Sequence, residues 1–342
     1  MLKSLDRKLA AIHADPHGAR QFIIADAKDA DMAFGLRGPG QLFDQHGHPS
    51  RFRTLAEYRE QIRGIVRQGL IDIMLMSNST SEQLTLKEKL FENSAVTPAI
   101  RANDTTDIWI MRGSKLADQA SRPFRTASID HAQCGKHACT PLERSKGANL
   151  GLYSITFAND RDRDWEALAA YSAFREEAER KQFRHFLEVF HPNVPGAVAT
   201  ELVVDFVSDT IVRTLAGVTS AGRPVFLKIP YPGPRPLEEL VAYDPHLVVG
   251  VLGGSAGTTR DAFQLIHDAQ KHGAKVALFG RKINEAEDQP LFVKHLRAIV
   301  DQGLDPSEAV RSYHAALKGQ GLKSRRSLDD DLRVTATSLS YS

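Results

Sequence analysis

Two ionisable residues stand inside short apolar runs that are typical of buried strands. Lys228 lies in VFLKIP and Glu188 lies in FLEVF. Because side chains alternate across a strand, Lys228 shares a face with Phe226, and Glu188 shares a face with Phe186. A charged group is rarely buried without a partner, since apolar walls cannot replace its hydration. The two residues are therefore candidates for a common role inside one core.

Schiff-base catalysis requires this combination of residues. A lysine amine attacks a carbonyl only when it is unprotonated, and burial favours the neutral amine. A carboxylic acid beside it moves protons while the carbinolamine loses water and a carbon–carbon bond breaks. Asp26, which ends the run FIIAD, is a third ionisable group expected inside or at the mouth of the same core. The alternative is a buried Lys–Glu ion pair without a catalytic role, although such pairs are often neutral or unfavourable for stability.

A second candidate site follows the run VVGVL. The chain passes through glycines and a serine at 253–257, and a helix is expected to begin near Thr258. Glycines let backbone N–H groups approach an anion, and a helix N-terminus favours negative charge. The next apolar run ends in FGRKI, which places Arg281 beside this loop in a barrel. The pattern indicates a phosphate site; a glycine-rich turn next to a surface arginine is the alternative.

The elements that position these residues form a repeating pattern. Eight apolar runs occur along the chain, at 21–26, 72–77, 95–103, 148–157, 184–190, 225–230, 247–254 and 275–280. Most are followed by a segment with helical periodicity, and near-continuous apolar strands joined by helices indicate a parallel sheet. Eight such units predict a (β/α)8 TIM barrel, whose site lies at the carboxyl ends of the strands. A doubly wound open sheet is the structural alternative.

The predicted barrel is a single domain over residues 1–320. Residues 104–146 are an insertion after the third strand, in which TTDIWIMRG and FRTASID are expected to form a hairpin. Residues 321–342 form a polar tail without a clear period. Two alternatives for the tail are a flexible segment and a segment packed on a neighbouring subunit, so a homo-oligomer is compatible with the sequence.

Composition limits the classes of partner. Of the 342 residues, 42% are hydrophobic and 25% charged, and the formal net charge is +2. This composition is typical of a globular domain and gives no global argument for nucleic acid or a membrane surface. The first residues show helical spacing of leucines with charges between them, which is unlike a signal peptide, and no apolar run approaches the roughly 18 residues of a membrane span. We expect a cytoplasmic protein whose partner is a small molecule.

One cluster contains residues of the types that ligate zinc. His131, Cys134, His137 and Cys139 lie in HAQCGKHAC. Structural zinc ligands usually come as two separated pairs, a spacing that this stretch lacks. We therefore expect an ordinary polar loop and no metal. Two cysteines in a chain of this length also argue against a secreted disulfide scaffold.

The motifs together resemble those of the class I (Schiff-base) aldolases. The resemblance runs from GANLGLYSITFAND through FLEVF, FLKIP and GGSAGT to FGRKI, and covers roughly residues 20–29 and 147–315. It points to the superfamily of deoxyribose-phosphate, archaeal-type fructose-bisphosphate and tagatose-bisphosphate aldolases, and most closely to the tagatose-bisphosphate branch. In this family Lys228 would form the Schiff base, Glu188 would act as acid and base, and Asp26 would assist.

The resemblance also implies how a phosphate is held. Its ligands would be Gly254, Ser255 and Arg281. The tagatose-type enzymes carry a lysine in the fourth strand, where this chain has Asn149, and an arginine after the first strand, where Lys28 replaces it. Both residues are therefore candidates for substrate contact, and both departures bear on which substrate is bound.

The expected activity is that of a cofactor-free lyase. It would cleave or form a carbon–carbon bond in a phosphorylated sugar or a related hydroxy-ketone. Two alternatives are a transaldolase-like Schiff-base transferase and a non-catalytic sensor of sugar phosphates that retains the barrel pocket.

Overall fold

The centre of the molecule is a ring of parallel strands. The structure, a computed structural model, describes residues 2–44, 48–254 and 257–339. The eight strands are β1 (Ile23–Lys28), β4 (Ile73–Met76), β5 (Thr97–Arg101), β8 (Leu150–Thr156), β9 (Arg184–Phe190), β10 (Leu227–Lys228), β11 (Gly250–Leu252) and β12 (Val276–Phe279). They pair in chain order, β12 pairs with β1, and a parallel bridge between Ile229 and Val251 joins β10 to β11. The predicted TIM barrel is confirmed, and the open sheet is not.

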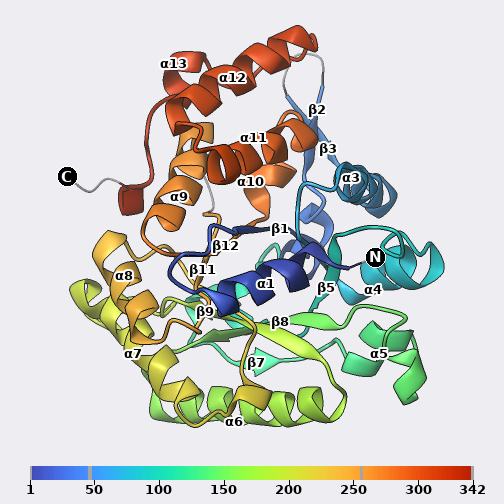
Figure 1. Ribbon diagram of the computed structural model, residues 1–342, viewed down its shortest axis with the longest axis vertical. Helices are drawn as coiled ribbons and strands as arrows, with labels where there is room; N and C mark the ends of the chain where they lie inside the picture. Colours follow the sequence, from blue (N-terminus) through green and yellow to red (C-terminus); the bar gives the residue numbers. More distant parts are fainter. Residues whose placement is uncertain (1, 45–47, 255–256, 340–342) are drawn as a thin grey trace.

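Helices surround the strands (Figure 1). The longer ones are α1 (Ser4–Ala14), α3 (Leu55–Gln68), α6 (Arg161–Arg180), α7 (Val203–Leu215), α8 (Pro234–Tyr243), α9 (Thr259–Lys271), α11 (Gln289–Gln302) and α12 (Pro306–Gly319). The shorter ones are α2 (Ala30–Phe34), α4 (Asn78–Ser81) with a π-helical continuation (Glu82–Lys87), α5 (Ile129–Cys134), α10 (Arg281–Asn284) and α13 (Leu328–Asp331). Single 3₁₀ turns cover Gly35–Arg37, Thr106–Ile108, Leu116–Asp118, Pro141–Glu143, Thr200–Leu202, Ser220–Gly222 and Thr337–Leu339. Within the described ranges, no helix combines the length and apolar character that crossing a bilayer requires.

Apolar side chains form two layers separated by the barrel wall. On β1, Ile23 and Ala25 belong to the inner layer, and Ile24 belongs to the outer layer between strands and helices. Both faces of the strands are therefore buried, which explains their continuous apolar runs. A side chain's function depends on which layer it enters, because only the inner face leads to the barrel mouth.

Helix α1 covers the amino ends of the strands. Its Leu5, Leu9 and Ile12 are buried within the inner layer, as their helical spacing suggests. Lys8 Nζ donates to the carbonyl of Phe22 at 2.8 Å and to Asp72 Oδ2 at 2.8 Å, just before β1 and β4. The barrel is thus closed at this end, and its accessible end is the carboxyl one.

The segment 104–146 leaves the barrel after β5. It begins with β6 (Asp104–Thr105), which pairs antiparallel with β7 (Pro123–Phe124), a hairpin shorter than the predicted one. Ile110 N donates to Ala33 O at 2.9 Å, and Arg37 Nη2 donates to Ile110 O at 2.8 Å. The insertion therefore lies over α2 at the barrel mouth. A second small hairpin, β2 (Gln41–Phe43) with β3 (Pro49–Phe52), follows α2.

The C-terminal tail packs on its own chain. Asp331 is buried, and its carboxylate accepts hydrogen bonds from Thr259 N at 2.7 Å and from His314 Nε2 at 2.9 Å. Further along, Thr335 N donates to Asp261 Oδ1 at 2.7 Å. The tail thus joins the start of α9 to α12.

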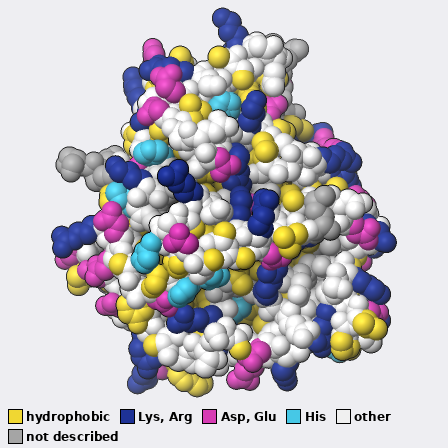
Figure 2. Space-filling model, in the orientation of Figure 1, with side chains coloured by type: hydrophobic (Ala, Val, Ile, Leu, Met, Phe, Trp, Pro, Cys, Tyr) yellow, Lys and Arg dark blue, Asp and Glu magenta, His cyan; other side chains and the backbone are white. Residues whose placement is uncertain are grey.

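The surface carries charges of both signs. On the face in Figure 2, lysine and arginine side chains lie among aspartate and glutamate side chains. This mixing is consistent with the formal net charge of +2 and with many exposed ion pairs, such as Arg51–Glu57.

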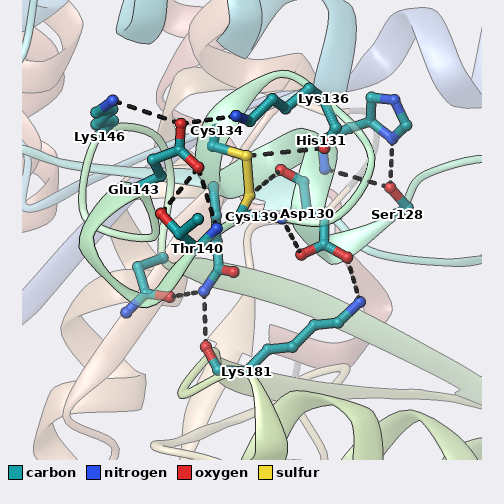
Figure 3. The surroundings of a disulfide bond; sticks show 12 residues. Ser128, Asp130, His131, Cys134, Lys136, Cys139, Thr140, Glu143, Lys146 and Lys181 are labelled. Carbon is teal, nitrogen blue, oxygen red and sulfur yellow. Dashed lines mark hydrogen bonds and ion pairs between the residues drawn. A yellow bond between two sulfur atoms is a disulfide. The ribbon is translucent and has the colours of Figure 1, made fainter.

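The cysteine–histidine loop contains a disulfide (Figure 3). Cys134 and Cys139 are bonded to each other, so their sulfurs are not free to ligate a metal in this state. Asp130 accepts hydrogen bonds from Cys139 N at 3.1 Å and from Lys181 Nζ at 2.5 Å. Across the described part of the chain, no group of three histidine, cysteine or acidic residues could hold a metal ion.

We predict that opening this disulfide changes stability only modestly. The cysteines are 5 residues apart, and cross-linking so short a loop removes little entropy from the unfolded chain, about 2 kcal/mol at most. Urea unfolding with and without a reductant measures the difference, and a Cys134→Ser/Cys139→Ser variant should match the reduced protein. Stoichiometric zinc in the reduced protein, found by elemental analysis, would instead make this loop a metal site.

Candidate active site

Lys228 and Glu188 meet at the carboxyl end of the barrel. They are partners in the register of β10 and β9, and Lys228 Nζ lies 2.5 Å from Glu188 Oε1. Both face inward, because Phe226 and Phe186, two residues earlier on each strand, stack in the inner layer with ring centroids 4.5 Å apart. The two residues are 7% and 1% exposed, so the amine and the carboxylate share one largely dry space.

Glu188 is held by a second set of partners. Its Oε2 accepts a hydrogen bond from Ser154 Oγ on β8 at 2.7 Å and lies 3.7 Å from Arg101 Nη2 on β5. Arg101 Nε in turn donates to Asp29 Oδ2 at 2.6 Å. Four charges of alternating sign thus run across the barrel mouth, from Lys228 through Glu188 and Arg101 to Asp29. Each buried charge has an opposite neighbour, which limits the cost of its desolvation.

Arg101, Asp29 and Ser154 were missed from the sequence. Arg101 follows Ala99 by two positions in the run AVTPAIRAN, so the same alternation that singles out Lys228 could have found it. Although burial opposes its charge, the carboxylates of Asp29, Glu188 and Asp104 raise the pKa of the Arg101 guanidinium above its usual range. Arg101 is therefore a fixed positive charge beside the reacting groups.

Asp26 and Lys28 lie on the other face of β1. The ladder partners of Asp26 are Met74 and Phe279, and both belong to the outer layer. Asp26 Oδ2 lies 3.0 Å from Lys28 Nζ, and both side chains are fully buried. Burial raises the pKa of Asp26 and lowers the pKa of Lys28. The expectation that Asp26 and Lys28 face the substrate is wrong in placement; Asp29, just after the strand, lines the pocket instead.

Asn149 lies at the opposite end of the barrel. It precedes the first residue of β8, accepts a hydrogen bond from Gln133 Nε2 at 2.7 Å, and donates to Gln182 O at 3.0 Å. It therefore cannot contact a substrate at the carboxyl ends of the strands. On β8 the mouth position belongs to Ser154.

The loop after β11 and the residue after β12 come together as expected. Gly254 and Arg281 both line the pocket, whereas Ser255 lies outside the described residues. A Cβ on Gly253 would lie 2.3 Å from Phe279 Cδ1, so only glycine lets this loop pass the end of β12. Arg281 lies over the ring of Phe34 at 6.0 Å, and burial lowers the pKa of its guanidinium. No carboxylate of the described chain forms an ion pair with it.

The amino end of α9 is already occupied. Thr258 N donates to Asp261 Oδ2 at 2.8 Å, and Thr259 N donates to Asp331 Oδ1 of the tail at 2.7 Å. These two carboxylates occupy backbone N–H groups that an anion could otherwise use, and a contribution of this helix terminus to anion binding stays a prediction. A phosphate at the loop would depend on Gly254 and on the Arg281 guanidinium.

A pocket opens above these groups. Its charged lining residues are Asp29, Arg101, Glu188, Lys228 and Arg281. Its apolar lining residues are Ala27, Ala30, Ala33, Phe34, Ile108, Ile110, Phe190, Leu252 and Leu278. The pocket thus has a charged floor below walls of aliphatic and aromatic carbon, and its glycines lie near Arg281.

Comparison with known proteins identifies the fold. No protein-family model matches the chain, and no curated protein matches its sequence. An archaeal fructose 1,6-bisphosphate aldolase is similar over 87% of this chain and 100% of its own, with a TM-score of 0.59 and 15% identity. Another structure of an archaeal fructose-1,6-bisphosphate aldolase has its catalytic lysine bound to the carbinolamine intermediate of the substrate. It is similar over 86% of this chain and 99% of its own, with a TM-score of 0.59 and 16% identity.

A bacterial structure gives a similar result. A fructose-bisphosphate aldolase from Slackia heliotrinireducens is similar over 91% of both chains, with a TM-score of 0.63 and 14% identity. These structural neighbours share the TIM barrel with this chain. At such low identity these neighbours establish the fold alone, and the chemistry of this chain depends on its own residues.

We predict that the Asp26–Lys28 pair is structural. Lys28→Met alone leaves a buried carboxylate without its cation and should cost about 3–5 kcal/mol of unfolding free energy. The double variant Asp26→Leu/Lys28→Met should be near wild type in urea unfolding, since two apolar groups of similar size replace the pair. A double variant as unstable as Lys28→Met would contradict this assignment.

We predict that Asp104 makes the free energy of unfolding depend on pH. Its Oδ1 lies 4.0 Å from Arg101 Nε. Burial, with the nearby carboxylates of Asp29 and Asp31, raises its pKa to about 6 despite the attraction of Arg101. The folded state then binds this proton more tightly than the unfolded state, so stability is lost as pH rises from about 4 to 6.

Asp104→Asn should remove this loss. Relative to wild type, its unfolding free energy should improve by about 2 kcal/mol between pH 4.5 and 7.5. Urea unfolding at several pH values measures the difference, and Asp118→Asn, at an exposed position of the same insertion, is the matched control. A difference that stays constant with pH would show that Asp104 ionises normally.

Proposed function

We propose that this chain is a class I aldolase, a lyase that cleaves or forms a carbon–carbon bond in a phosphorylated hydroxy-ketone through an imine at Lys228. The observation that carries the proposal is the 2.5 Å contact between Lys228 Nζ and Glu188 Oε1 at the floor of the pocket. A lysine so placed is beside an acid, and it faces the end of the barrel at which TIM-barrel enzymes act.

The reaction begins with a proton transfer. Movement of a proton from Lys228 Nζ to Glu188 Oε1 gives a neutral amine, which attacks the substrate carbonyl and forms a C–N bond. Glu188 returns its proton to the alkoxide oxygen, takes a second proton from the nitrogen, and delivers it to the carbinolamine hydroxyl, which leaves as water and produces the iminium. In cleavage, the C–C bond breaks, its electrons move to the iminium nitrogen, and Glu188 accepts the hydroxyl proton of the departing aldehyde. Protonation of the enamine and hydrolysis by water release the second product.

The neighbouring groups support this proton traffic. Ser154 Oγ donates to Glu188 Oε2 and so leaves Oε1 facing the amine. Arg101 keeps a positive charge near Glu188, and its pairing with Asp29 fixes its position. We assign to Asp29, which lines the pocket, the assisting role that the family resemblance gave to Asp26.

Gly254 and Arg281 supply the anion site of this proposal. They lie on the same pocket as Lys228, and Arg281 is a cation with room for a bidentate contact to a phosphate. The similarity to fructose-bisphosphate aldolases at the level of the fold supports the same reaction type. The tagatose-bisphosphate branch, the cytoplasmic location and a homo-oligomer are further proposals from the sequence alone.

The imine can be tested directly. Borohydride added with a substrate ketone should reduce the imine, inactivate the protein and leave a stable adduct on Lys228, read by peptide mass spectrometry. Lys228→Arg should give neither adduct nor turnover, because a guanidinium stays protonated. Glu188→Gln should still form some adduct, with turnover lower by roughly two to four orders of magnitude. Lys318→Arg, at an exposed position on α12, is the control.

The same experiment separates the alternatives. A tolerated Lys228→Met/Glu188→Leu variant with no adduct in the wild type would make the pair purely structural. An adduct without turnover would indicate a sensor. Turnover that requires a second aldehyde, with no free aldehyde released in its absence, would indicate a transferase.

A further inference from the structure

We infer that this pocket takes a substrate with one anionic group and an apolar remainder, and that it does not take a bisphosphate. The inference narrows the substrate class of the proposed aldolase and so rests on that proposal.

The charges leave room for one anion. Lys228 is paired with Glu188 at 2.5 Å, and Arg101 is paired with Asp29 at 2.6 Å. Among the lining residues that the structure describes, Arg281 is the cation that forms no ion pair with a carboxylate, although Glu285 attracts it from a longer distance. One phosphate therefore finds a partner beside Gly254, whereas a second would face the already balanced pairs and lose its hydration without compensation.

The uncharged part of the described lining also offers few partners to hydroxyl groups. None of its described lining residues carries a neutral hydroxyl or amide side chain. The nearest one, Ser154 Oγ, already donates to Glu188 Oε2 and accepts from Arg101 Nη1 at 3.2 Å. Above the charged floor, where Arg101 and Asp29 already bond to each other, a chain of several hydroxyls would thus exchange water for carbon. Because unpaired buried hydroxyls are costly, a polyhydroxylated sugar fits this pocket poorly.

The walls are suited to an apolar group. Ala33 and Phe34 of α2 line one part of the pocket, and Ile108 and Ile110 of the insertion line another. The bond from Ile110 N to Ala33 O, 2.9 Å long, ties the two segments together. Ile110 is 40% exposed, so a ligand with an aliphatic or aromatic group would bury carbon that is otherwise in water. The insertion thereby adds an apolar wall above the reacting groups.

In the direction of synthesis, one reactant would carry the phosphate and the other would be uncharged. The enamine carbon attacks the aldehyde carbonyl, the new alkoxide takes a proton from Glu188, and water hydrolyses the iminium. No other reactant is needed. The apolar wall favours an aliphatic or aromatic group at the unphosphorylated end of the product.

Binding can be tested with probes that have no carbonyl and cannot form an imine. The first pair is 2,5-anhydromannitol 1-phosphate and its 1,6-bisphosphate, and the second is butyl phosphate and glycerol 3-phosphate, all titrated by calorimetry. The bisphosphate should bind about tenfold or more weakly than the monophosphate, because its second phosphate loses hydration against charges that are already paired. Butyl phosphate should bind at least about fivefold more tightly than glycerol 3-phosphate, because its carbon is buried.

Two variants test the walls and the anion site. Ile110→Lys adds a cation to the apolar wall and should make the bisphosphate bind about tenfold more tightly than the monophosphate. Leu142→Lys, which adds the same charge at an 89% exposed position, should not. Arg281→Ala should weaken every phosphate by about tenfold or more.

The outcomes distinguish this inference from the proposed function. Wild-type protein that binds the bisphosphate as tightly as the monophosphate or more tightly, or glycerol 3-phosphate as tightly as butyl phosphate or more tightly, would overturn the inference and leave the imine untouched. Undetectable binding of all four probes would overturn it as well. Failure to trap an adduct on Lys228 would instead remove the aldolase proposal, while these affinities would still define the pocket's ligand.

Discussion

The structure around the barrel mouth depends on keeping a lysine amine in a largely dry space beside a carboxylate. Lys228 and Glu188 come from adjacent strands in register, so their 2.5 Å contact is fixed by the backbone ladder. A pair buried this deeply needs its remaining polar atoms satisfied. Ser154 donates a hydrogen bond to Glu188, Arg101 lies beside the same carboxylate, and Arg101 in turn donates to Asp29. These contacts connect the neighbouring strands electrostatically to the buried pair.

The chain contains two buried lysine–carboxylate pairs with different surroundings. Lys28 and Asp26 occupy the layer between β1 and the helices, where both are fully enclosed. Lys228 and Glu188 occupy the inner face, at the floor of a pocket. The two pairs consist of the same types of residue, but only Lys228 and Glu188 line a pocket that a ligand can enter. In a barrel whose strands are buried on both faces, the face decides whether such a pair can meet a substrate.

Segments outside the barrel determine what surrounds the reacting groups. The insertion brings Ile108 and Ile110 over α2 and adds carbon to the pocket wall. The tail places Asp331 at the start of α9, where its carboxylate occupies a backbone amide that an anion could otherwise use. Arg281 is left as the unpaired cation among the described lining residues. The barrel thus supplies the buried Lys228–Glu188 pair, and the added segments define the other walls of its pocket.

The sequence by itself determined the repeating pattern and the two inward residues at its centre. Eight apolar runs separated by helical periodicity predict the barrel, and alternation along VFLKIP and FLEVF places Lys228 and Glu188 on faces with Phe226 and Phe186. The glycines before Arg281 likewise indicate that the loop after β11 and the end of β12 meet. These features are local or follow from the order of the strands.

Only the tertiary structure decided which other residues share the mouth. Both faces of β1 are apolar, so its alternation cannot tell the inner face from the outer, and Asp26 proved to be outside while Asp29 lies inside. Strand ends are equally undetermined, which is why Asn149 was assigned to the wrong end of β8. Contacts of the insertion and the tail join residues far apart in the chain. Their positions depend on packing and long-range hydrogen bonds, and no local spacing encodes those.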